Sequence, residues 1–131
     1  MPVQQESQAI AVARAHVEAW SNHNYDAARA SLADDVTVTA TTVDPVMPKT
    51  DLAGIDDYVH GLVEFARAVV PGSAEVLASI GDDRHALLLV TVRAAFGPDA
   101  PEMTLPGARL YLLDEDEKIK AEQVTFFAAA E

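Results

Sequence analysis

The spacing of apolar residues changes at Pro71-Gly72, and no other feature of the chain constrains its fold as strongly. Before this pair, apolar residues recur mainly with helical spacing; after it, β-type segments alternate with turn residues. Helices that precede a run of hairpins are typical of the α+β class. With 131 residues and 14.0 kDa, the chain has the length of one domain, so we expect residues 1–131 to fold as a single unit.

Secondary structure can be placed from periodicity and from turn residues. An apolar stripe that includes Val17 and Trp20 predicts the first helix, and Asn24 or Asp26 can cap the second. A β-bulge is expected at Pro106-Gly107. We expect helices at residues 5–21, 27–32 and 54–69, and strands at 36–43, 75–80, 86–96, 103–113 and 118–127.

Composition argues against several classes of partner. Half of the residues are hydrophobic, yet no apolar run approaches the ~20 residues of a membrane span, so no membrane partner is expected. The 21 acidic residues against 9 basic ones give a net charge of −12, which repels nucleic acid and anionic lipid. The first ten residues lack the basic and apolar segments of a signal peptide, so the expected location is the cytoplasm.

Metal and cofactor chemistry has no support in the sequence. Without cysteine there is no thiolate zinc ligand and no thiol nucleophile. His23, His60 and His85 lack the spacing that would bring two of them to one metal from a helix, and no glycine-rich phosphate loop occurs. We therefore expect neither a metal nor a cofactor.

Local motifs carry a family resemblance. They are Val17-Glu-Ala-Trp20, Asn22-His-Asn24, Asp26-Ala-Ala28, Leu32-Ala-Asp-Asp-Val36 and Lys118-Ile119. Together with the order of elements, they make the chain resemble the SnoaL-like branch of the nuclear transport factor two-like superfamily over nearly its whole length. The resemblance implies a cystatin-like fold, in which a curved antiparallel sheet with three helices on its concave face encloses an apolar pocket. This superfold hosts cyclases, isomerases, hydrolases and non-enzymatic binders.

The resemblance can be followed at single positions. Steroid isomerases of the superfamily use a tyrosine, an aspartate base and a second aspartic acid, whose positions fall on His16, Ala40 and Arg109 in this chain. With the base absent and both donors changed, the resemblance disfavours that mechanism here. The SnoaL-type polyketide cyclases carry a carboxylate on the last strand, and Glu122 lies at or near that position.

The last hairpin predicts a charged pair. A symmetric turn about Glu115-Asp116 sets Arg109 opposite Glu122 and Tyr111 opposite Lys120, all on one face of the sheet. A carboxylate in an apolar pocket can act as acid or base, and the arginine can hold an anionic oxygen of a substrate. The same two residues can also form a salt bridge that has no further role.

Further candidate residues surround this pair in the expected pocket. Trp20 and Tyr58 lie on apolar helix faces, while Tyr111 and Phe126 belong to the last two strands. Each can form pocket wall or simply core. His16, at the edge of the first apolar stripe, can donate to a bound carbonyl or be a buried structural histidine.

The outer face of the sheet is also expected to be apolar. Leu110, Leu112 and Ile119 should point away from the pocket, and a solvated face would be polar instead. We therefore expect a second copy of the chain to cover this convex face, as a homodimer. Homodimers of this kind are common in the family that the chain resembles.

Two functions fit these observations. The first is a cofactor-free cyclase, isomerase or hydrolase that acts on a small apolar carbonyl compound, with Glu122 as acid or base and with Arg109 and His16 polarising an oxygen. The second is a non-catalytic ligand-binding or structural domain. Unbonded polar groups that converge in an apolar cavity would favour the enzyme, whereas a filled cavity with a fully paired Arg109 and Glu122 would favour the second function.

Overall fold

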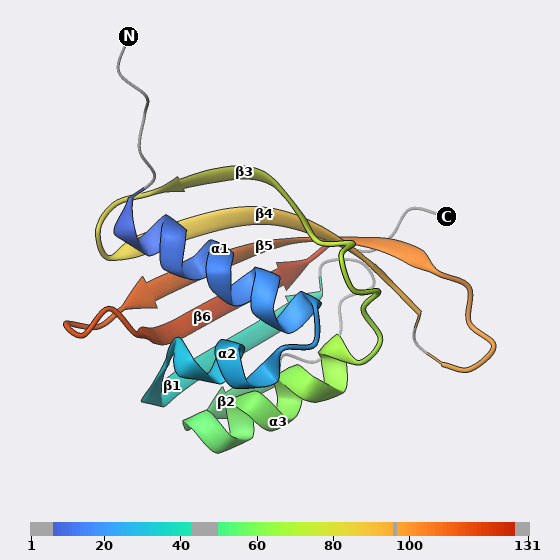
Figure 1. Ribbon diagram of the computed structural model, residues 1–131, viewed down its shortest axis with the longest axis horizontal. Coiled ribbons are helices and arrows are strands. Elements are labelled where there is room, and N and C mark those ends of the chain that lie inside the picture. Colours follow the sequence, from blue (N-terminus) through green and yellow to red (C-terminus); the bar gives the residue numbers. More distant parts are fainter. Residues whose placement is uncertain (1–6, 43–49, 96, 128–131) are drawn as a thin grey trace, which may run out of the picture.

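A computed structural model of the protein describes residues 7–42, 50–95 and 97–127 (Figure 1). It confirms the expected order of elements and adds one short strand, β2, between β1 and α3. The predicted helix start at residues 5–6 and the predicted strand ends at 43 and 96 lie outside the described residues. The helices are α1 (Gln8–Ser21), α2 (Tyr25–Ala30) and α3 (Ile55–Ala66), and the strands are β1 (Leu32–Thr42), β2 (Thr50–Ala53), β3 (Glu75–Gly81), β4 (His85–Ala94), β5 (Met103–Leu113) and β6 (Ile119–Phe126).

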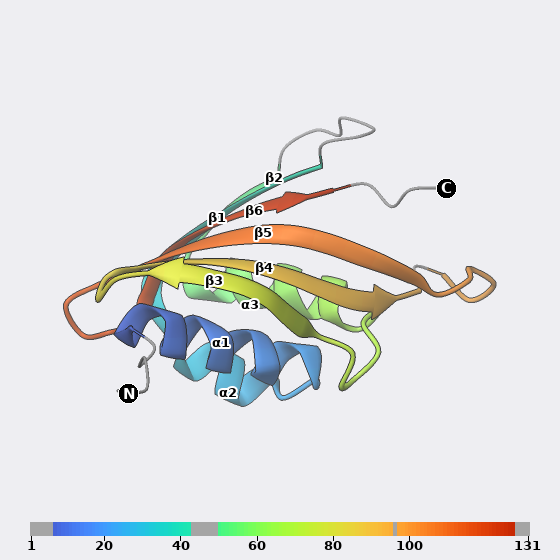
Figure 2. The same ribbon diagram turned by 90° about the horizontal axis from the view of Figure 1, so that it is seen from above.

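The strands form one curved sheet in the order β2-β1-β6-β5-β4-β3, with the helices on its concave side (Figure 2). Helix α1 packs mainly on β3, β4 and β5, and α3 packs on β1 and β2. This arrangement confirms the α+β architecture expected from the sequence. Neighbouring strands run antiparallel except β1 and β6, which are parallel, so the sheet is mixed at that one junction.

A capping side chain determines where α2 begins. A side-chain oxygen of Asn24 accepts the backbone N–H of Ala27 at 3.3 Å, so α2 begins at Tyr25, two residues before the predicted start. Just before this cap, His23 has a φ of 65°, a left-handed conformation that ends α1 and redirects the chain. Leu32, predicted as the end of the second helix, is instead the first residue of β1.

Two expectations about β5 are wrong. Arg109 lies opposite Val124 and Tyr111 lies opposite Glu122, a register that differs by two residues from the predicted one. A shift of two residues preserves the face on which each side chain lies, so Arg109 and Glu122 still share the concave face, as diagonal neighbours. The bulge expected at Pro106-Gly107 is absent, because both residues pair with β4 without interruption.

A displaced turn and a bulge at the start of β6 together explain the difference of two residues in register. The turn closes with a 2.8 Å hydrogen bond from the backbone N–H of Asp114 to the carbonyl of Lys118, and Lys120 is then skipped in the pairing with β5. Lys120 is exposed and does not share the inner face with Tyr111 as predicted. Because the bulge exchanges faces, Ile119 is fully buried in the core, and its assignment to the convex face is wrong.

The convex face still carries exposed apolar side chains, in a row different from the predicted one. Ile80, Leu87 and Leu110 are successive cross-strand neighbours on β3, β4 and β5, and they are 68%, 41% and 41% exposed. Leu112, which lies on the same face, is half-buried. The convex row is therefore Ile80, Leu87 and Leu110.

The core fills one part of the space between the helices and the concave face. Its largest fully buried side chains include Trp20, Leu88, Tyr111 and Leu113. Where the sheet curves over α3, the side chains no longer fill this space, and a pocket remains.

Candidate functional site

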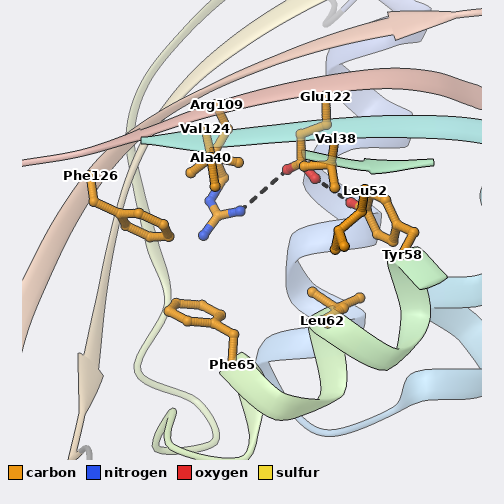
Figure 3. A pocket seen from close by; sticks show the side chains of 11 residues that line it. Val38, Ala40, Leu52, Tyr58, Leu62, Phe65, Arg109, Glu122, Val124 and Phe126 are labelled. Atoms are coloured by element: carbon orange, nitrogen blue, oxygen red, sulfur yellow. Dashed lines mark hydrogen bonds and ion pairs between the residues drawn. The ribbon is translucent and has the colours of Figure 1, made fainter. Parts of the chain in front are cut away.

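A pocket of about 250 Å³ lies between α3 and the strands β1, β2, β5 and β6 (Figure 3). Its wall is apolar except at three side chains, Tyr58, Arg109 and Glu122. Pockets for drug-sized ligands span roughly 300–1,000 Å³, so this one suits a small molecule. The lining residues are Val38, Ala40, Leu52, Tyr58, Gly61, Leu62, Phe65, Arg109, Glu122, Val124 and Phe126.

The charged pair of the pocket is formed by Arg109 of β5 and Glu122 of β6. Arg109 Nη1 donates to Glu122 Oε2 at 3.2 Å, and the two side chains are only 6% and 3% exposed. A guanidinium has five N–H donors and a carboxylate about four acceptor positions, and their mutual bond uses one of each. Figure 3 shows the guanidinium on the pocket side of the sheet, facing both phenylalanine rings of the pocket.

The second oxygen of Glu122 is held from α3. Tyr58 donates its hydroxyl proton to Glu122 Oε1, and the same hydroxyl oxygen lies 3.1 Å from His16 Nε2. The other ring nitrogen of His16, Nδ1, lies 3.1 Å from the carbonyl oxygen of Ala28 and 2.8 Å from Ser31 Oγ. An unbroken series of polar contacts therefore runs from the end of α2 to the pocket.

Aromatic rings surround the guanidinium. Arg109 Cζ lies 4.7 Å from the ring centroid of Trp20, 5.6 Å from that of Phe126 and 5.8 Å from that of Phe65. Such cation–π contacts stabilise a desolvated arginine, by about 2 kcal/mol in favourable cases. The rings thus help to keep a charged group at a place from which water is largely excluded.

Two buried polar atoms beside this site have no hydrogen-bond partner within the described residues, Trp20 Nε1 and the Tyr111 hydroxyl. The ring of Tyr111 packs edge-on against His16, with 6.0 Å between the ring centroids. Tyr111 is therefore a buried neighbour of Tyr58 whose hydroxyl interacts with Glu122 and Arg109 but makes no hydrogen bond of good geometry and does not contact His16 Nε2 as Tyr58 does.

Burial dominates the protonation states. Desolvation lowers the pKa of His16 from 6.5 to about 4, although Glu122 and the hydrogen bond to Ala28 act in the opposite direction. Burial, followed by the charge of Glu122, raises the pKa of both Tyr58 and Tyr111. Desolvation disfavours the charged form of Arg109, but Tyr111, Glu122 and Tyr58 together raise its pKa. At neutral pH, His16 and both tyrosines are therefore neutral and Arg109 is charged.

The lowered pKa of His16 predicts a loss of stability in mild acid. The unfolded chain binds a proton at this histidine below pH 6.5, whereas the folded chain does so only near pH 4. The contribution of His16 is therefore complete above pH 6.5 and is lost as the pH falls towards about 4. At ~1.4 kcal/mol per pH unit, the loss is on the order of 3 kcal/mol.

Urea unfolding between these two pH values measures this effect. The His16→Gln variant should lose most of the dependence on pH, while the same change at the exposed His60 should leave it intact. An unchanged slope in His16→Gln would contradict the assignment of the acid sensitivity to His16.

The candidate residues from the sequence fall into two layers. Those that line the pocket are Tyr58, Arg109, Glu122 and Phe126. Those that lie behind it are His16, Trp20 and Tyr111. Residues of the second layer contact residues that line the pocket: His16 contacts the Tyr58 hydroxyl, and the ring of Trp20 lies against the Arg109 guanidinium.

The sequence did not identify several apolar residues of the pocket wall. Leu62 and Phe65 share the helix face of Tyr58, so the helical spacing carried a signal for them. Leu52 comes from β2, a strand that the sequence did not predict. Ala40, where steroid isomerases carry their base, also lines the pocket and contributes only a methyl group.

The part of the chain that the structure describes lacks two kinds of feature. Within it, no group of three or more histidine, aspartate or glutamate side chains is arranged to hold a metal ion. None of the described helices has the length and apolar character needed to cross a membrane.

Comparisons with known proteins agree on the family and the fold. The model of the SnoaL-like domain matches residues 13–122. No curated protein matches the chain. Among solved structures, a protein of Kribbella flavida DSM 17836 is 21% identical, with 92% of this chain and 88% of that chain covered and a TM-score of 0.72.

Two other solved structures have names that refer to chemistry. A protein of Shewanella putrefaciens CN-32, whose name assigns it to the SnoaL-like polyketide cyclases, is 11% identical over 93% of this chain and 81% of that chain, with a TM-score of 0.75. An LEH-like epoxide hydrolase of M. tuberculosis is 18% identical over 91% of this chain and 82% of that chain, with a TM-score of 0.69. At these identities the similarity establishes the fold alone.

Proposed function

This chain belongs to the family of SnoaL-like domains, and we propose that its pocket is the active site of a cofactor-free enzyme that moves a proton on a small apolar carbonyl compound. The reaction would be of the cyclase, isomerase or hydrolase kind. One observation carries the proposal: Arg109 and Glu122 share a hydrogen bond in a pocket whose wall is otherwise polar only at Tyr58, and each keeps unused hydrogen-bonding capacity.

The proposed chemistry assigns one task to each charged group. Glu122 removes a proton next to the substrate carbonyl, so that a C–H bond breaks, an O–H bond forms on the carboxyl, and the electron pair moves to the carbonyl oxygen. Arg109 donates its free N–H groups to the resulting enolate oxygen, in surroundings of low polarity where this attraction is strong. His16 does not line the pocket, so it would act on this step only through Tyr58.

Two fold neighbours are compatible with this proposal. Their names, a polyketide cyclase and an epoxide hydrolase, refer to small-molecule chemistry on the same fold. The second function, binding without turnover, is favoured by one specific observation: both oxygens of Glu122 already accept a hydrogen bond, one from Tyr58 and one from Arg109.

Proton exchange into deuterated water separates the two functions without knowledge of the natural substrate. The protein is incubated with small cyclic ketones such as cyclohexanone and 2-tetralone, and loss of the signal of the protons next to the carbonyl is followed by NMR. We expect saturable exchange, faster than in buffer, that is suppressed in Ala40→Leu, because the larger side chain occupies the pocket. Binding without accelerated exchange would support the second function, and absence of binding would contradict both.

We also propose that a second copy of the chain covers the convex face. The row of Ile80, Leu87 and Leu110 is apolar and exposed, and a two-fold axis through it would bury both copies of the row together. Sedimentation at micromolar concentration should give a dimer for the wild type and a monomer for Leu110→Lys. Ala11→Lys, on the exposed side of α1, adds the same charge elsewhere and should leave the dimer intact. A monomeric wild type would contradict the proposal.

A further inference from the structure

The contacts of His16 determine which of its ring nitrogens carries the proton. The carbonyl oxygen of Ala28 can only accept, and the Ser31 hydroxyl already donates its proton to that same oxygen at 2.8 Å. Nδ1, which contacts both oxygens, is therefore the nitrogen that donates. In a neutral ring, Nε2 is then a bare acceptor that faces the Tyr58 hydroxyl oxygen at 3.1 Å.

Two acceptors therefore compete for one hydroxyl proton. Tyr58 has a single proton, and both His16 Nε2 and Glu122 Oε1 lie where they could accept it. When Tyr58 donates to an ionised Glu122, the lone pair of Nε2 faces the oxygen of Tyr58 without a proton between them. The site therefore has one proton too few to form a hydrogen bond at each of these two contacts. Leaving a buried acceptor without a hydrogen bond is costly.

One additional proton satisfies every contact. If it binds to the Glu122 carboxyl, that group donates to the Tyr58 oxygen, and Tyr58 turns its own proton to His16 Nε2. His16 stays neutral in this arrangement, which agrees with its burial and with the nearby positive charge of Arg109. Placing the proton on His16 instead would create a buried cation, which desolvation opposes.

We propose that His16, Tyr58 and Glu122 take up one proton as a unit, with the proton on the Glu122 carboxyl and the Tyr58 hydroxyl turning from Glu122 to His16. His16 is a positioning residue in this unit: it never contacts the substrate, but it offers an acceptor that is used only after Glu122 has been protonated. Two neighbours outside the unit act on Glu122. Arg109 donates to the ionised carboxylate, and the Tyr111 hydroxyl interacts with Glu122 without a hydrogen bond of good geometry.

The inference deepens the proposed function, because a base that gains a hydrogen bond on protonation is suited to receive a substrate proton. It does not depend on turnover, however. Proton uptake is measured on the free protein. If the three residues do not take up a proton as a unit, the result of the exchange assay with ketones is unaffected. If the protein does not accelerate exchange on ketones, the result of the pH titration is unaffected.

The experiment is a pH titration by NMR of protein labelled with ¹³C at glutamate carboxyls and ¹⁵N at histidine rings. The Glu122 carboxyl carbon and the His16 Nε2 resonance should shift together with one midpoint, while His16 Nδ1 keeps its proton. In Tyr58→Phe the two resonances should separate, by about one pH unit or more. Tyr111→Phe removes a neighbouring hydroxyl that does not join His16 to Glu122, so the midpoint can move but should stay common to both resonances.

The wild type alone can overturn the inference, even if Tyr58→Phe does not fold. Separate midpoints for Glu122 and His16, or no change at Nε2 while the carboxyl titrates, would show that Tyr58 does not couple them. A proton already present on Nε2 at neutral pH would contradict the assigned tautomer. A common midpoint retained in Tyr58→Phe would show that the coupling does not pass through the hydroxyl.

Discussion

Replacing Glu122 with glutamine is expected to slow proton exchange on a bound ketone by about 100- to 10,000-fold, the usual contribution of a positioned acid or base. Glutamine keeps the size of the side chain, and its amide oxygen can still accept from Arg109 or Tyr58. What it cannot do is take a proton from carbon. Because the pocket wall is otherwise unchanged, binding of the ketone should change far less than the rate of exchange.

The assay is the same NMR measurement of exchange in deuterated water, run with wild type and variant at equal saturation. Glu75→Gln provides the matched control, since it makes the same chemical change on an exposed part of β3. Thermal unfolding verifies that Glu122→Gln is folded. An unchanged exchange rate would remove Glu122 from the site and leave the pair with Arg109 as a salt bridge only.

The pocket pair could be found from the sequence even though the hairpin register was wrong. The predicted turn placed Arg109 directly opposite Glu122, whereas a turn displaced by one residue and the one-residue bulge at Lys120 together make them diagonal neighbours. The error was an even number of residues, and side chains in a strand alternate with a period of two, so both residues remained on the inner face. The same bulge moved Ile119 to the other face, because a single skipped residue reverses the alternation.

Other parts of the site depend on contacts that no local pattern reveals. The spacing on α3 predicted the face that carries Tyr58, but not that its hydroxyl would join His16 and Glu122, which lie 42 and 64 residues away in the chain. Strand β2 has only four residues and is held by pairing with β1, so its sequence alone carries little β signal. Tertiary pairing, not propensity, brings its Leu52 into the pocket wall.

Replacing Arg109 with methionine is expected to destabilise the fold by about 3–5 kcal/mol, the cost of leaving one member of a buried ion pair without its partner. Glu122 would keep the hydrogen bond from Tyr58 but lose its charged partner, and the cation–π contacts with Trp20 and the two phenylalanines would be lost as well. Methionine fills much of the same volume. The loss of stability should therefore come mainly from the missing charge and not from a cavity.

A surface pair, formed by Arg93 of β4 and Glu102 just before β5, isolates the effect of burial. Arg93 and Glu102 approach to 2.8 Å, closer than the pocket pair, but their side chains are 58% and 46% exposed. Solvent screening limits such pairs to about 0–1 kcal/mol, so Arg93→Met should cost far less than Arg109→Met in urea unfolding. Adding Glu122→Gln to Arg109→Met should recover part of the loss, because no unpaired charge then remains in the pocket. Equal losses for the two arginines, or no recovery in the double variant, would mean that the pocket pair is hydrated like a surface pair. The proposed chemistry, which requires charged groups in surroundings of low polarity, would then lose its basis.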